Sequence, residues 1–66
     1  MYDERVLRAE IYAHGKTPRQ VSQDIGMNER TFYRKMRSGG WKIDEAREVI
    51  RAASIPLNRG ADIFLT

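Results

Sequence analysis

The side chains of this 66-residue chain best suited to chemistry are three arginines that share one face of a short expected helix. Arg30, Arg34 and Arg37 recur at intervals of four and three residues, so a step of about 100° per residue gathers them opposite Phe32 and Met36. A guanidinium group has a permanent charge and several N–H donors, which suit a phosphate or the O6 and N7 atoms of guanine. The pattern favours an anionic partner; a solvated charged face without a partner is the alternative.

Two more polar residues stand at the start of the same helix. Asn28 is able to pair with adenine and Glu29 is able to accept from cytosine. With Arg30 and Arg34 they are the candidate base-reading residues, because side chains near the N-terminal end of a helix contact base edges in the major groove. Glu29 also has a structural interpretation, since a carboxylate in the first turn is favourable in the field of the helix dipole.

Positive charge is concentrated in the middle of the chain. The net charge is +3, and the isoelectric point is near 9.7. Residues 16–42 hold seven basic and two acidic side chains, an excess of +5, whereas residues 1–15 and 43–66 each carry −1. A patch of this kind is what binding to a phosphate backbone requires.

The elements that hold this face are all expected to be helices. Residues 3–14 form the first, with Asp3 as its N-cap and with Leu7, Ile11 and His14 on one face. For His14, the single histidine, packing and a charge at the helix end are the two expected roles, rather than that of a ligand or a base. No stretch alternates between polar and apolar residues for long enough to predict a strand.

The second and third expected helices meet at a short turn. The second starts at Thr17, a capping residue, with Pro18 in the favoured first position, and it ends at Gly26. Asn28 caps the third helix, over residues 29–37. So short a connection forces a tight corner and predicts a helix-turn-helix.

The rest of the chain is expected to complete a small core. A fourth helix spans residues 43–53, and Asn58 caps a short last helix. The apolar residues assigned to the core by these two helices are Ile43, Ala46, Ile50, Ala53, Ile63, Phe64 and Leu65. For the last three, a dimer interface is the alternative to the core. The predicted fold is a single all-α domain over residues 1–66, with four or five helices.

The run TPRQVSQDIGMNERTFYRKMRSGG resembles the helix-turn-helix of the phage repressor and Cro group, also called the Xre family. The segment WKIDEAREVIRAA is similar to the fourth helix of that family, and NRGADIFL to the last helix of its small phage members. The resemblance covers nearly the whole chain, most specifically residues 16–46. It implies a sequence-specific regulator of transcription that reads double-stranded DNA with its third helix, about residues 28–37, in the major groove.

The same resemblance implies roles for individual residues. It assigns base reading to Asn28, Glu29, Arg30 and Arg34. It assigns phosphate contacts to Lys16, Thr17, Arg19, Tyr33, Arg37 and Lys42. Lys42 stands where the family has a Thr or Ser cap, so we expect a weaker start to the fourth helix. Trp41 is expected to anchor its loop in the core rather than to stack on a base.

The expected partners follow from this interpretation. One helix in one groove covers only a few base pairs, so a homodimer on DNA is predicted, with half-sites about one helical turn apart. We expect no cofactor, metal or small-molecule ligand and no enzymatic activity, since there is no cysteine, one histidine and no Gly-rich phosphate loop after a strand. No apolar run approaches the length of a membrane span, and the expected location is the cytoplasm of a bacterial or phage-infected cell, at the nucleoid.

A protein-interaction module is the alternative hypothesis. An antirepressor, which binds another regulator instead of DNA, would serve as an example. Such a module would present apolar residues on the exposed face of the third helix, where this chain has arginines.

Overall fold

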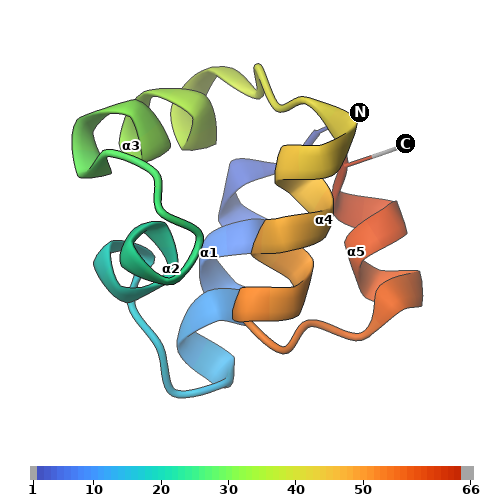
Figure 1. The fold of residues 1–66 in the computed structure, drawn as a ribbon. Coiled ribbons are helices and arrows are strands. Elements are labelled where there is room, and N and C mark those ends of the chain that lie inside the picture. The colour runs from blue at the N-terminus through green and yellow to red at the C-terminus, as the bar shows by residue number, and fades with distance from the viewer. Residues whose placement is uncertain (1, 65–66) are drawn as a thin grey trace.

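The computed structural model describes residues 2–64, and the regular structure in that range is entirely helical. The helices are α1 (Glu4–Ala13), α2 (Pro18–Asp24), α3 (Glu29–Ser38), α4 (Ile43–Ala52) and α5 (Leu57–Phe64). In Figure 1, α2 and α3 lie on one side of the molecule and α5 on the other, with α1 and α4 between them. The predicted all-α fold is confirmed.

Side-chain caps start the first three helices at the predicted residues. The carboxylate of Asp3 and the amide oxygen of Asn28 each accept hydrogen bonds from backbone N–H groups in the first turn of α1 and α3. Thr17 and Gln20 cap reciprocally: the Thr17 hydroxyl accepts from the Gln20 N–H at 3.2 Å, and the Gln20 side chain accepts from the Thr17 N–H at 2.9 Å. These bonds satisfy N–H groups that have no partner within a helix.

The five helices close around one apolar core. Phe32 is completely buried, and its ring meets Trp41 edge-on with the ring centroids 5.3 Å apart. Trp41 also packs against Phe64, which confirms its predicted role as an anchor of the loop. The other fully or nearly fully buried apolar side chains are Leu7, Ile11, Pro18, Val21, Met36, Ala46, Val49, Ala53, Ile55 and Ile63.

The assignment of Ile43 to the core is wrong, and His14 lies outside the core as well. His14 follows the last residue of α1; its ring is exposed, and Nδ1 donates to the Glu10 carbonyl oxygen at 2.7 Å, so of its two expected positions the structure has the end of the helix. Ile43 is the first residue of α4 and is 68 % exposed, because the buried face of this helix begins only at Ala46.

The start of the last helix also differs from the prediction. α5 begins at Leu57, and the Pro56 carbonyl accepts the Gly60 N–H at 2.9 Å, so Pro56 and not Asn58 precedes the helix. Gly60 is buried where α5 approaches α4, and a Cβ atom there would clash with the Ile50 side chain. The predicted core residue Leu65 lies outside the described residues.

Candidate nucleic-acid interface

Helix α3 divides into a buried face and a charged face. Phe32 and Met36 are completely buried, whereas Arg30, Arg34 and Arg37 are exposed on the opposite side. None of these three guanidinium groups pairs with a carboxylate among residues 2–64. The predicted arginine face is therefore present, and its charge is available to a ligand.

The turn between α2 and α3 fixes the position of the charged face. Gly26 has φ +70°, a left-handed conformation that side chains with a Cβ adopt only with strain. The Met27 N–H then donates to the Ser22 carbonyl at 2.9 Å, which closes the end of α2. Ser22 is completely buried, and its hydroxyl donates to the Arg19 carbonyl at 2.7 Å, so its polar group is satisfied where the helices pack.

An ion pair attaches α3 to α4. Lys35 Nζ lies 2.6 Å from both carboxylate oxygens of Glu45, and the two side chains are only 16 % and 21 % exposed. The same carboxylate accepts the Lys42 N–H at 2.9 Å and so caps α4, while the Lys42 side chain makes no capping bond. The hydrogen bonds from Lys35 and from the Lys42 backbone hold the pKa of Glu45 below its usual value.

Its pairing with Lys35 makes Glu45 a positioning group, a role that the sequence did not predict. Its place in the first turn of α4 is a signal for capping, because an acidic residue there can reach back to the backbone of the N-cap. Nothing in the local sequence indicates that Lys35 would be its second partner.

The two candidate base readers at the start of α3 already have partners. The Asn28 oxygen accepts the Arg30 N–H at 2.9 Å and the Thr31 N–H at 3.4 Å, which leaves only its amide hydrogens for a ligand. Glu29 Oε1 lies 3.6 Å from Arg19 Nε, across the α2–α3 junction. Both side chains of this pair are at least half exposed, so water and salt screen the attraction strongly.

Of the candidate phosphate contacts, Tyr33 and Arg37 lie on α3, and Thr17 and Lys42 lie at the starts of α2 and α4. Tyr33 is half-buried beside the arginine face, with its ring edge-on to Phe32, and Arg37 lies one turn further along α3. Thr17 is occupied as the cap of α2, and Lys42 is exposed at the start of α4.

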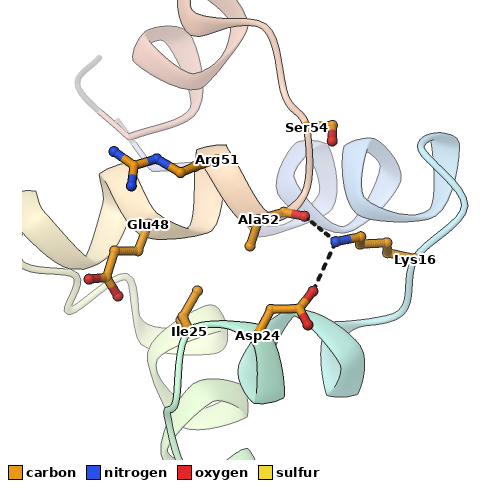
Figure 2. A pocket seen from close by; sticks show the side chains of 7 residues that line it. All are labelled: Lys16, Asp24, Ile25, Glu48, Arg51, Ala52 and Ser54. Carbon is orange, nitrogen blue, oxygen red and sulfur yellow. Dashed lines mark hydrogen bonds and ion pairs between the residues drawn. The ribbon is translucent and has the colours of Figure 1, made fainter.

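Lys16 lies apart from the arginine face. Its ammonium group donates to Asp24 at 2.9 Å and to the Ala52 carbonyl, and so links the ends of α2 and α4 (Figure 2). Figure 1 places this loop, between α1 and α2, at the opposite end of the molecule from α3. The structure thus brings Arg30, Arg34, Arg37 and Tyr33 onto one helix and directs Lys16 elsewhere.

The described residues offer few other kinds of site. No three His, Asp or Glu side chains among them gather closely enough to hold a metal ion. None of the helices formed by residues 2–64 combines the length and apolar character needed to cross a membrane. The hollow shown in Figure 2 is lined mainly by polar groups, and its Lys16 and Asp24 already pair with each other.

Comparison of the chain with family models, with curated proteins and with solved structures finds no match. The case for a function therefore depends on the residues and their arrangement.

Proposed function

We propose that this protein is a sequence-specific regulator of transcription that inserts α3 into the major groove of double-stranded DNA. One observation carries the proposal: the three exposed arginines of α3 have no carboxylate partner among residues 2–64, on a helix whose opposite face is completely buried. Arg30 lies in the first turn of the helix, the end from which major-groove readers contact bases, and Arg34 follows one turn later on the same face. The resemblance to the repressor and Cro group adds support from sequence.

The proposed binding has two physical components. Arg37 and Tyr33, together with the exposed Arg19 and Lys42, supply affinity that falls as salt rises, because counterions are released when phosphates are neutralised. Arg30 and Arg34 supply discrimination, since each is able to donate two hydrogen bonds to one guanine. Two copies would read two half-sites, because one helix covers only a few base pairs.

The test is selection from a pool of random duplexes at moderate salt, followed by sequencing of the bound fraction. We expect an enriched, two-fold symmetric sequence with guanines in each half. If duplexes are bound but no sequence is enriched, the protein is a non-specific basic DNA binder. Failure to bind any duplex would refute the proposal and favour the antirepressor-like alternative.

Variants assign the roles of individual arginines. Arg34→Ala is expected to cost about 1–3 kcal/mol on the selected duplex and to relax the preference at one base position. Arg37→Ala should weaken all duplexes alike and reduce the salt slope by about one. Arg5→Ala is the matched control, because Arg5 is an exposed arginine of α1 without an ion-pair partner among the described residues. Equal losses for Arg34→Ala and Arg5→Ala would contradict base reading by Arg34.

A further inference from the structure

The surface between α4 and α5 carries an apolar groove. Ile43 and Leu57 border it and are 68 % and 75 % exposed, the two most exposed large apolar side chains among the described residues. Ala46 and Gly60 line it between the two helices and are buried, so their small size leaves room for side chains from outside. Large apolar side chains grouped around such a hollow are a feature of interaction sites.

The charge along this α4–α5 groove has a single sign. Arg47 is the charged side chain that lines it, and the groove continues past Leu57 into a second hollow that Arg47 and Arg51 line. No carboxylate of residues 2–64 lines either hollow. Neither guanidinium group has an ion-pair partner in that range of the chain. The groove is therefore apolar along its length and positive along its α4 edge.

We propose that the α4–α5 groove binds a helix of a different protein, one whose apolar face is bordered by aspartate or glutamate. In Figure 1, this surface is on the side of the molecule away from α2 and α3, so the site does not overlap the arginine face of α3. The proposal adds a second binding site and does not depend on whether α3 binds DNA.

The shape of the groove favours a helix over an extended segment. The neighbouring helix α4 has ten residues, which gives a length of about 15 Å, or about three turns. An amphipathic helix fits a groove of this kind by inserting apolar side chains from successive turns. An extended peptide instead needs an open sheet edge, and the regular structure of residues 2–64 is entirely helical.

The unpaired arginines specify the charge of the partner. A helix seated in the groove takes the Arg47 guanidinium out of water, and an unpaired charge in such a contact is costly. A carboxylate on the partner removes this cost, because it accepts two parallel hydrogen bonds from one guanidinium group. A second acidic residue further along the same helix is placed to reach Arg51.

A second copy of this chain suits the groove less well. In a symmetric pair centred on the groove, the Arg47 side chains of the two copies face each other, and like charges repel. The carboxylates of α4 that would have to compensate, Asp44 and Glu48, do not line the groove. The observations therefore favour a partner with the opposite charge.

The test is a selection of yeast-displayed random peptides, about 15 residues long and so roughly 22 Å as a helix, on the intact protein without nucleic acid. Peptides that also bind the Leu57→Gln protein are removed by counter-selection. We expect enriched sequences with apolar residues at i, i+3 or i+4 and i+7, and with aspartate or glutamate beside them. If no peptide distinguishes the parent from Leu57→Gln, or if the enriched peptides are neutral or basic, the proposal is overturned.

Affinities of the enriched peptides for variants locate the site. Arg47→Glu and Ile43→Gln should each weaken binding at least about tenfold, and lysine in place of the peptide's acidic residues should restore binding to Arg47→Glu. Arg5→Glu is the matched control, because Arg5 is an exposed arginine of α1 without an ion-pair partner among the described residues. Circular dichroism verifies that each variant is folded.

Two further outcomes would overturn the proposal. Loss of peptide binding in Arg34→Glu but not in Arg47→Glu would place the peptide on the arginine face of α3. Sedimentation of the protein alone, from micromolar to millimolar concentration, tests the second copy: self-association that Leu57→Gln abolishes would show that the groove pairs with itself. Because these measurements contain no DNA, a failure of the duplex selection would refute the proposed function and leave this result unchanged.

Discussion

The ion pair between Lys35 and Glu45 should stabilise the fold by holding α3 against α4, and Glu45→Gln is the most direct perturbation. Glutamine keeps an oxygen able to accept the Lys42 N–H, so the cap of α4 can persist while the negative charge is removed. The Lys35 ammonium then loses a partner whose two oxygens both lie 2.6 Å away.

The expected loss of stability follows from how far the Lys35–Glu45 pair is buried. Exposed ion pairs contribute about 0–1 kcal/mol, and removing one partner of a fully buried pair costs about 3–5 kcal/mol. At 16 % and 21 % exposed, this pair lies between those limits, and we expect a loss of about 1–2 kcal/mol. Domains of this size lose about 4–8 °C in Tm for each kcal/mol, so the midpoint should fall by about 5–15 °C.

The assay is urea and thermal unfolding followed by circular dichroism, in a double-mutant cycle with Lys35→Met. Glu48→Gln is the matched control, because Glu48 is an exposed carboxylate on the same helix without an ion-pair partner among residues 2–64. A coupling energy within about 0.3 kcal/mol of zero would refute the reasoning, as would equal losses for Glu45→Gln and Glu48→Gln.

The same pair predicts a dependence on pH. The pKa of Glu45 is lower in the folded protein than its ordinary value of 4.5. Its contribution is therefore complete above pH 4.5 and is lost as the pH falls below that value through the folded pKa. Glu45→Gln should flatten this part of the stability profile relative to the parent protein.

Three further changes test other parts of the structure. Phe32→Ala removes a completely buried ring and should cost about 3–5 kcal/mol. The whole free energy of unfolding expected for a chain of this length is about 3–10 kcal/mol, so circular dichroism at 37 °C should show loss of the helical signal. A cooperative unfolding transition near that of the parent would contradict the central place of Phe32 in the core. Thr17→Ala should lower stability in urea by about 1 kcal/mol because α2 loses its cap, and no change would show that water replaces the hydroxyl. Burial raises the pKa of Tyr2, whose hydroxyl donates to the Met36 carbonyl at 2.6 Å. The folded protein should therefore lose stability as the pH rises above 10, and Tyr2→Phe should remove this part of the decline. Identical alkaline stability profiles for the two proteins would refute the assignment to Tyr2.

Features of this protein that depend on nearby residues were predictable without a structure. The caps at Asp3, Thr17 and Asn28 each bond to backbone groups two or three residues away, so their partners are specified by the local chain. The two faces of α3 follow from helical spacing alone, because large apolar residues must be buried and arginines remain in water.

Other features were decided when distant segments came together. Lys35 and Glu45 are on different helices, and Lys16 reaches Ala52 near the far end of the chain, so neither contact has a local signature. Ile43 has the spacing of a core residue, but the packing of α5 on α4 leaves it at the edge of a groove. Periodicity determines which residues share a face of a helix, and only the tertiary structure determines how much of that face another helix covers.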